Sequence, residues 1–394
     1  MSRLTIVALA LAACALACSG SAGSRDGGAG SGSAGAGSGS AGFQGGGGAG
    51  TGGSSTAGTA GSSSAGSPGT AGTAAGSDAA VSPPDSGDAT TGPGGDPVAW
   101  GPPFVAVGYK AVRAFSADGK TWTTAPDPAV LPAGWTGPSV YGDNQWLLRG
   151  ACWGQGKFLA VGGTGGDLGL MLASTDGNAW SLVGGAQAND DCAYGNGLWV
   201  TQIRWSQDGT TFTKLTTGTS ARRIVYGDGV FVAAGDNSIA YTKDGKSWTS
   251  LAITFKGATP ADRKGYNHVA FGNHRFLAVN TTIATAPVFE WDGVSDTSFT
   301  ETPHPADLPG SQTYDLAYGR HAFYVSGFGA LYRRADGATT WQKIAGMGGA
   351  TELYNLAVTD DLFVDERWWS ADGALWTKST NPPEGITKIV ATPR

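Results

Sequence analysis

Short apolar runs alternate with polar turns from about residue 100 onward, and one phrase occurs there seven times. An apolar run is followed by Ser/Thr-x-Asp-Gly, two or three residues and a large aromatic, as in FSADGKTW, which ends at Trp122. The closing aromatics stand at positions 122, 180, 212, 248, 299, 341 and 376, about 42 residues apart, and the fifth copy, EWDGVSDTSF, is degenerate. This period fits four short strands with their turns, the size of one β-propeller blade.

The fourth copy shows how one unit divides into strands. Asp-Gly between alternating apolar runs is a strong hairpin signal, because the turn requires a positive φ that Gly adopts without strain. The four runs predicted as strands are Arg222–Gly227, Val230–Gly235, Ser238–Thr242 and Lys246–Leu251. No run in this region has helical periodicity, so the sequence predicts an all-β fold.

The two ends of the repeat region complement each other. The first copy begins at Phe104 without the strand that precedes this position in other copies, whereas Thr387–Ala391 has the pattern of that strand. A C-terminal strand that completes the first blade closes the ring and removes its open edges. The sequence therefore predicts a seven-bladed β-propeller over residues 98–394; six or eight blades would require a miscount at the degenerate copy.

The first residues, MSRLTIVALALAACALAC, predict a signal peptide over residues 1–17. One Arg precedes an apolar run that is too short to span a bilayer, and small residues lead up to a Cys. This ending resembles a bacterial lipobox, in which the new N-terminal Cys is acylated. Lipidation at Cys18 fits the cysteine count better than lipidation at Cys14, since it leaves no spare thiol in an oxidising compartment. An ordinary signal peptide is the alternative.

Residues 18–97 consist mainly of Gly, Ser, Ala and Thr. Such a segment buries too little apolar surface to offset the entropy of ordering, so we expect a disordered tether. No later stretch reaches the length of a transmembrane helix. We therefore expect an exported monomer, anchored to the outer membrane or the cell surface only through its N-terminal lipid.

Charge and composition exclude several classes of partner. The formal net charge is −6 and no basic run occurs, which argues against nucleic acid as a partner. The four His residues lack metal-ligand spacing, and no Ser or Cys triad pattern stands out. We expect no metal, no cofactor and no catalytic residues of these kinds.

The Ser-x-Asp-Gly-x-x-Trp copies resemble the Asp-box repeats of bacterial BNR and sialidase-type propellers, with one residue fewer between Asp and Trp. In that family the Asp bonds the backbone of the turn and the aromatic packs between strands. The resemblance implies a structural role for Asp118, Asp176, Asp208, Asp244, Asp336 and Asp372. The Arg-Ile-Pro signature of sialidases is absent, since Arg113 precedes Ala114-Phe115 instead.

The positions where the chain enters each innermost strand form the candidate ligand site, because side chains from all blades converge there on the mouth of the central channel. Aligned on the Gly (Thr in the last copy) five residues later, they are Arg149, Asp190, Arg222, Asn267, Tyr314 and Tyr354. The next positions hold Asp191, Arg223, His268, Asp315 and Asn355. Two Arg among several Asp would suit a sugar, an anion or an acidic peptide; a solvated rim without ligand is the alternative.

Two cysteines stand in neighbouring inner strands. Cys152 lies two residues before its aligned Gly and Cys192 lies three before its own. Because strand faces alternate, this offset lets the two thiols face each other, and we expect a disulfide between the second and third blades. Two buried thiols are the alternative.

These features together predict a lipid-anchored binding or scaffold module for a glycan or an envelope protein at the channel mouth. The alternative is a polysaccharide-acting glycoside hydrolase or lyase with a non-standard active site. Such an enzyme could draw a carboxylate pair from Asp190, Asp315 or Glu366.

Overall fold

The structure is a computed structural model, and it describes residues 103–127, 147–163, 169–183, 189–219, 221–235, 239–251, 266–281, 287–294, 300–308, 313–344 and 347–392. The predicted signal peptide, the tether and both candidate lipidation sites, Cys14 and Cys18, lie outside these residues. Within the described residues, no helix has the length and apolar character that crossing a membrane requires.

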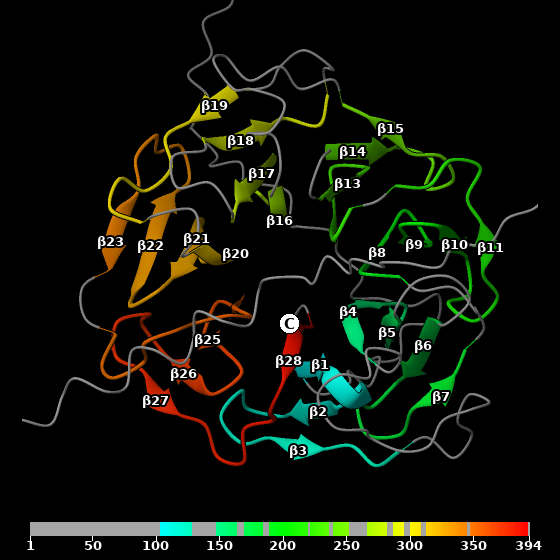
Figure 1. Cartoon of the computed structure of the whole chain (residues 1–394), viewed down its shortest axis with the longest axis horizontal. Coiled ribbons are helices and arrows are strands. Elements are labelled where there is room, and N and C mark those ends of the chain that lie inside the picture. The colour runs from blue at the N-terminus through cyan, green and yellow to red at the C-terminus, as the bar shows by residue number, and fades with distance from the viewer. Residues whose placement is uncertain are drawn as a thin grey trace, which may run out of the picture. The chain divides into compact units, whose positions relative to one another are not determined.

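Seven four-stranded antiparallel sheets surround a central axis, so the protein is the predicted all-β, seven-bladed propeller (Figure 1). Strands are given from the innermost outward. Blade one consists of β28 (Ile386–Ala391), β1 (Phe104–Gly108), β2 (Arg113–Ser116) and β3 (Thr123–Thr124), and blade two of β4 (Leu148–Gly154), β5 (Lys157–Gly163), β6 (Gly169–Ser174) and β7 (Ser181–Leu182). Blade three consists of β8 (Cys192–Gly195), β9 (Leu198–Thr201), β10 (Arg204–Ser206) and β11 (Thr213–Lys214). A single 3-10 turn among the described residues, η1 (Tyr109–Ala111), joins β1 to β2.

The remaining four blades follow in chain order. Blades four and five are β12 (Arg223–Gly227), β13 (Val230–Ala234), β14 (Ile239–Thr242) and β15 (Thr249–Ser250); and β16 (Tyr266–Gly272), β17 (Arg275–Asn280), β18 (Val288–Trp291) and β19 (Thr300–Thr302). Blades six and seven are β20 (Thr313–Gly319), β21 (Ala322–Gly327), β22 (Ala330–Ala335) and β23 (Gln342–Ile344); and β24 (Ala357–Val358), β25 (Phe363–Val364), β26 (Trp368–Ser370) and β27 (Thr377–Lys378).

The predicted closure of the ring is confirmed. β28 pairs antiparallel with β1, so that Val105 lies opposite Val390. The Thr387 hydroxyl also lies within hydrogen-bonding distance of two carbonyl oxygens, 3.1 Å from that of Val107 and 2.6 Å from that of Leu148. The last strand therefore completes blade one and joins it to blade two.

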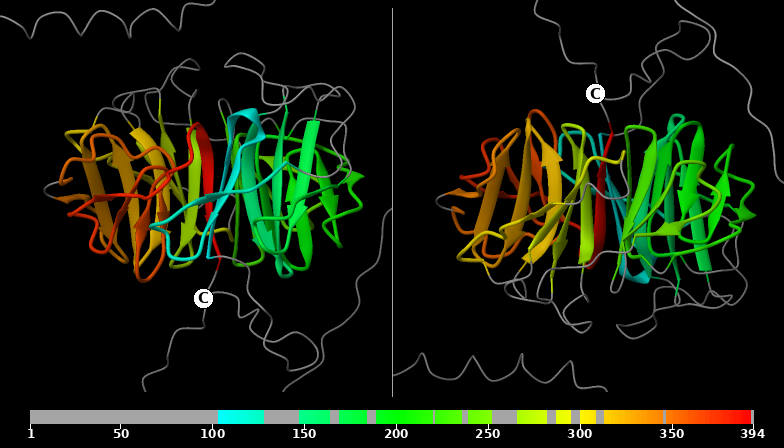
Figure 2. Two further views of the ribbon diagram at one scale, coloured as in Figure 1. Left: turned by 90° about the horizontal axis from the view of Figure 1, so that it is seen from below. Right: turned by 90° about the horizontal axis from the view of Figure 1, so that it is seen from above.

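Each blade has two ends, which fixes where its turns lie. In every blade the innermost strand starts at the same face of the ring as the turn between the second and third strands, because the strands are antiparallel. The Asp-Gly hairpins between the third and fourth strands lie at the opposite face, and Figure 2 shows turns at both faces. We call the first the mouth face and the second the box face.

The hydrophobic core lies between neighbouring blades. Val105 and Val107 of blade one pack against Leu148 and Phe158 of blade two, and all four side chains are buried. The aromatic that ends each unit also belongs to this core in blades one, two, four and seven, where the buried residues are Trp122, Trp180, Trp248 and Trp376. Removing one buried ring of this kind typically destabilises a protein by about 3–5 kcal/mol.

Glycines at the ends of the inner strands let the blades approach closely. A Cβ on Gly154 would lie 2.1 Å from the ring of Tyr194, and one on Gly195 would lie 2.2 Å from the ring of Tyr226. Each glycine therefore receives the aromatic ring of the next inner strand. This contact explains the recurring aromatic-Gly pair on which the units align.

Five of the six predicted Asp-box aspartates bond the backbone of their hairpins. In blade one, Asp118 Oδ1 accepts the amide N–H groups of Lys120 and Thr121, both at 2.8 Å, and Ser116 Oγ accepts that of Gly119 at 2.9 Å. Partial burial alone would raise the pKa of Asp118, but these donors hold it below its usual value. The same bonds are made by Asp176, Asp208, Asp244 and Asp372.

Asp336 in blade six departs from the predicted role. The serine position two residues earlier is occupied by Arg334, which has no hydroxyl to hold the turn. Arg334 is buried instead, and its guanidinium contacts Glu290 of blade five at 2.7 Å. Asp336 accepts the Tyr318 hydroxyl at 2.9 Å. The sixth hairpin is therefore held by side chains that span two blades.

Candidate functional site

The predicted mouth residues lie at one end of the ring, in two layers. The first layer, where the chain approaches each inner strand, forms the rim of the mouth. The second layer, one residue further along, lies deeper and surrounds the channel axis. The two layers differ in how far their polar groups are already occupied by the protein itself.

Deep-layer side chains bond one inner strand to the next. Asp191 Oδ2 accepts the amide N–H of Ile224 at 3.1 Å, and Asp315 Oδ2 accepts that of Leu356 at 2.7 Å. Asn355 Nδ2 donates to the carbonyl of Ile386 at 2.9 Å. These residues satisfy backbone groups that the ring geometry leaves without a strand partner, so their first role is structural.

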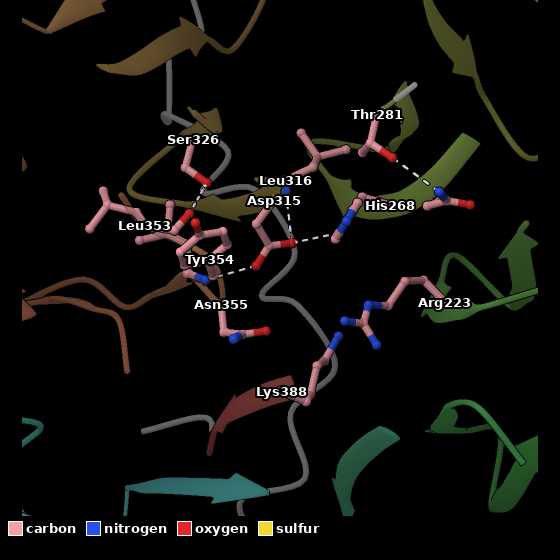
Figure 3. A network of polar contacts seen from close by, with 12 residues as sticks. Arg223, His268, Thr281, Asp315, Leu316, Ser326, Leu353, Tyr354, Asn355 and Lys388 are labelled. Atoms are coloured by element: carbon pink, nitrogen blue, oxygen red, sulfur yellow. Dashed lines mark hydrogen bonds and ion pairs between the residues drawn. The ribbon is translucent and has the colours of Figure 1, made fainter. Parts of the chain in front are cut away.

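Arg223 lies across the central channel. It starts the inner strand of blade four, yet its guanidinium donates to the carbonyls of Arg149 in blade two (3.1 Å) and Thr387 in blade one (2.9 Å). Figure 3 shows Arg223 and Lys388 pointing toward His268 and Asp315. The side chain therefore connects blades that are not neighbours in the ring.

Charges in the deep layer are paired within the protein. His268 Nδ1 lies 2.8 Å from Asp315 Oδ1, and Lys388 Nζ lies 3.7 Å from Asp191 Oδ2. Burial alone would raise the pKa of Asp315, but the hydrogen bond and charge of His268, aided by Lys388 and Arg223, hold it below its usual value. Asp191 thus has the Lys388 ammonium nearby, and Asp315 has the His268 ring as a hydrogen-bond partner.

The rim over blades two to five is also largely self-satisfied. Arg149 Nε donates to the Gly163 carbonyl at 3.0 Å and lies 3.2 Å from Asp190 Oδ1. Burial raises the pKa of Asp190, against the lowering effect of Arg149 and Arg222. Arg222 is exposed, and the Asn267 amide donates to Thr281 Oγ1 at 3.0 Å. Among the described residues of this half, Arg149 and Asp190 are paired with each other, whereas Asn267 Oδ1 is buried without a hydrogen-bond partner.

Aromatic side chains gather on the rim over blades six and seven. The rings of Tyr314 and Tyr354 lie with their centroids 4.4 Å apart and their planes at 35°. Phe328, in the turn between β21 and β22, is 55% exposed, and the next residue, Gly329, donates its N–H to the Thr351 carbonyl at 2.6 Å. A large, exposed aromatic ring therefore lies beside the segment that leads to Tyr354.

Two glutamates and one arginine lie beside these rings. The Tyr354 hydroxyl is hydrogen-bonded to Glu352, and burial together with this carboxylate raises the pKa of the tyrosine. Arg367 Nε lies 3.1 Å from Glu366 Oε1, and Nη2 of the same Arg367 side chain lies 3.9 Å from Glu352 Oε2. We call Tyr314, Phe328, Glu352, Tyr354, Glu366 and Arg367 the aromatic–acidic rim.

Carboxylates in this rim are poorly neutralised. Burial and the neighbouring Asp365 raise the pKa of Glu366 to about 7, although Arg367 lowers it. Burial also raises the pKa of Asp365 itself to about 6. Buried or largely buried carboxyl groups with such raised pKa values are typical of functional sites.

The sequence located part of this rim. Tyr314 and Tyr354 were predicted from their register, and Glu366 was considered as a carboxylate, whereas Phe328, Glu352 and Arg367 were missed. One available signal was the large aromatic between two glycines, since Gly327-Phe328-Gly329 places an apolar ring in a tight turn. Among the described residues, no group of three or more His, Cys, Asp or Glu side chains is placed to hold a metal ion.

The two predicted cysteines are joined by a disulfide below the mouth. Cys152 of β4 and Cys192 of β8 have Cα atoms 5.6 Å apart, and both side chains are buried. The bond links the inner strands of blades two and three. It takes no part in the rim.

A second hollow lies at the box face, between blades five and six. It is an open cavity of about 650 Å³ whose lining includes Arg275, Glu290, Arg334 and Asp336. Glu290 is held by Arg334 at 2.7 Å and lies 3.9 Å from Arg275. These pairs account for the breakdown of the sixth hairpin pattern and supply no unpaired cation or aromatic platform.

No family model and no curated protein matches the chain. Among solved structures, the chain is similar to a protein from Lactobacillus plantarum, with a TM-score of 0.45, 11% identity, and coverage of 73% of this chain and 98% of that one. It is also similar to YCF48 from Cyanidioschyzon merolae, with a TM-score of 0.43, 13% identity and coverage of 60% and 86%.

A further likeness is to PorZ, a bacterial surface component of the type-IX secretion system of Porphyromonas gingivalis. The TM-score is 0.44, the identity is 13%, and the match covers 61% of this chain and 33% of PorZ. Likenesses at this level identify neither a family nor a ligand for this protein.

Proposed function

We propose that this protein is an envelope-displayed binding module whose ligand, a glycan, docks on the aromatic–acidic rim of the propeller. The observation that carries the proposal is the concentration over blades six and seven of aromatic rings, of which Phe328 is exposed and Tyr314 and Tyr354 are partly buried, together with incompletely neutralised carboxylates. Sugar rings stack their C–H faces on aromatic side chains, and their hydroxyls donate to carboxylates. The described residues of the rim over blades two to five do not show this combination.

The proposed display rests on the N-terminal sequence. A signal peptide over residues 1–17, a lipid on Cys18 (or Cys14) and a tether over residues 18–97 would hold the propeller, residues 98–394, at the outer membrane or the cell surface. The five capped hairpins support membership among the Asp-box propellers of BNR type. In the producing cell, Cys18→Ser should move the protein from the membrane fraction to the soluble fraction, whereas unchanged fractionation would contradict lipidation there.

A glycan array with the soluble propeller tests the binding function. Tyr314→Ala should weaken binding of an authentic glycan by about five- to thirtyfold, since stacking of a sugar on one aromatic ring is worth roughly 1–2 kcal/mol. The matched control is the Arg149→Ala/Arg222→Ala double variant, which alters the opposite half of the rim. Equal binding by wild type and Tyr314→Ala, or a larger loss in the double variant, would place the ligand elsewhere.

One observation favours an enzymatic alternative. The pKa of Glu366, about 7, suits a general acid near neutral pH, and Glu352 lies close enough to share Arg367 with it. A polysaccharide-acting hydrolase or lyase would release reducing ends or unsaturated products from a bound glycan. Turnover that disappears in Glu366→Gln while glycan binding persists would establish this alternative over simple binding.

A further inference from the structure

The deep layer and the rim over blade seven differ in how far their carboxyl groups are paired with other side chains. In the deep layer, Asp191 and Asp315 face Lys388 and His268 at 3.7 and 2.8 Å. On the rim over blade seven, Glu352 and Glu366 share the guanidinium of Arg367, at 3.9 and 3.1 Å. A third carboxyl, Asp365, lies directly behind them and is fully buried. This part of the rim therefore has more carboxyl groups than cationic groups in contact with them.

The groups that face Glu366 come from several elements. Arg367 follows it in the chain, Asp365 precedes it, Glu352 reaches it from the segment before β24, and the backbone N–H of Ile386 bonds it from β28. Of these, Arg367 and the N–H group stabilise the ionised carboxylate, while the two other carboxyls oppose it. A positive charge brought by a ligand would complete the pairing.

The aromatic rings of the rim also favour a positively charged ligand group. Tyr314 and Tyr354 lie beside Glu352, and the exposed Phe328 belongs to a turn of blade six that is hydrogen-bonded to Thr351, in the segment leading to Tyr354. The face of an aromatic ring attracts an ammonium group, and the attraction adds to that of a neighbouring carboxylate. Carboxylates and ring faces together recognise a cation better than they recognise a neutral or acidic group.

We propose that the ligand of the aromatic–acidic rim is a glycan with free amino groups, whose ammonium lies between Glu352 and Glu366 while its rings pack on Tyr314 and Phe328. The inference rests on the proposed function and names its ligand class. A glycan meets the whole surface, because its hydroxyls suit the Tyr hydroxyls and carboxylates and its C–H faces suit the rings. Its ammonium pairs with Glu352 and favours the ionised form of the neighbouring Glu366.

The test compares two probes of equal length, the β-1,4-linked tetramers of glucosamine and of N-acetylglucosamine, by calorimetry with the soluble propeller at pH 6.5. The wild type should bind the glucosamine tetramer about tenfold more tightly. The Glu352→Gln/Glu366→Gln variant should lose this preference while its affinity for the N-acetyl tetramer changes by less than about threefold. Asp190→Asn, which removes a carboxylate from the opposite half of the rim, should keep the preference. Circular dichroism and thermal unfolding check that each variant is folded.

Four outcomes would overturn the inference. Equal affinity for the two tetramers, or a preference that survives in the double Gln variant, shows that no ammonium is held by the two glutamates. Tighter binding of a tetralysine peptide than of the glucosamine tetramer points to a basic protein partner instead. Binding of neither tetramer removes this ligand class. The proposed function fails separately, since binding of the N-acetyl tetramer that depends on Tyr314 would preserve it without the ammonium subsite.

Discussion

Asp365 should make the folded protein less stable as the pH rises from about 4 to about 7. Its side chain is fully buried, and it accepts the backbone N–H groups of Tyr354 at 2.9 Å and Arg367 at 3.1 Å. Burial nevertheless raises the pKa of this carboxyl to about 6, against an ordinary value of 3.8. The hydrogen bonds and the charge of Arg367 oppose this rise but do not cancel it.

The sign of this pH dependence follows from which state, folded or unfolded, binds the Asp365 proton more tightly. The folded state holds the proton up to about pH 6, whereas the unfolded chain releases it near pH 4, so proton binding favours folding fully below about pH 4. This contribution is lost as the pH rises through about 6. A gap of about 2 pKa units, at about 1.36 kcal/mol each, amounts to about 3 kcal/mol.

Replacing the carboxyl by an amide isolates this effect. Asp365→Asn cannot titrate, and it turns one amide N–H toward a backbone donor, which adds a pH-independent cost of about 1–3 kcal/mol. The wild type should therefore lose about 3 kcal/mol of unfolding free energy relative to the variant between pH 4 and pH 7. Urea unfolding of both proteins at four pH values measures the difference.

The neighbouring Glu366 titrates with the same sign, since its pKa is also raised, to about 7. Glu366→Gln, alone and combined with Asp365→Asn, separates the two contributions. If the curves of wild type and Asp365→Asn run parallel with pH, or if the wild type gains stability relative to the variant as the pH rises, the argument from burial is refuted.

Two further predictions concern the frame of the propeller. The Cys152→Ala/Cys192→Ala variant removes the disulfide and opens a loop with a sequence separation of 40. Loop-closure entropy predicts that the free energy of unfolding falls by about 4 kcal/mol, which urea unfolding measures. A fall of less than about 1 kcal/mol would contradict this. Asp244→Ala should cost about 1 kcal/mol, because it removes a cap on two amide groups. Asp336→Ala, which leaves its hairpin amides unchanged, should cost less, and equal losses would contradict the difference between the two hairpins.

The propeller itself could be predicted from local rules. Asp-Gly requires a particular turn wherever it occurs, and the aromatic four residues after Asp118 or Asp176 must then fall on the buried side of the next strand. Closure of the ring could be predicted because the strand that begins at Phe104 had no inner strand before it in the sequence, and Thr387–Ala391 supplied that strand. Such features depend on a few consecutive residues, so they can be identified without the structure.

The exception at Asp336 could also be detected in the sequence. Arg334 replaces the serine that bonds the turn, and three residues instead of two separate Gly337 from Trp341. A guanidinium cannot replace a hydroxyl in so tight a turn, so the hairpin had to be held in another way. Its partner Glu290 could not be predicted, because that contact joins two blades.

Register predicted which positions line the mouth, but it could not show which of them are already bonded within the protein. Arg149 and Arg222 occupy equivalent positions in the sequence and Arg223 follows directly, yet it is Arg223 that lies across the channel, while Arg149 pairs at the rim. The rim residues Phe328 and Glu352 come from turns and connections that follow no period. Their place depends on how separate segments pack, which a repeat pattern does not encode.

The pairing of β28 with β1 has a consequence for the order of folding. Thr387 bonds Val107 across 280 residues of chain, so blade one cannot be completed until the whole ring has been synthesised. Contacts between such distant residues form late, because the intervening chain must be ordered first. Until then β1 presents an open edge, where a neighbouring chain could pair with it. We expect refolding to be limited by this last joining step, and aggregation to be greatest just before it.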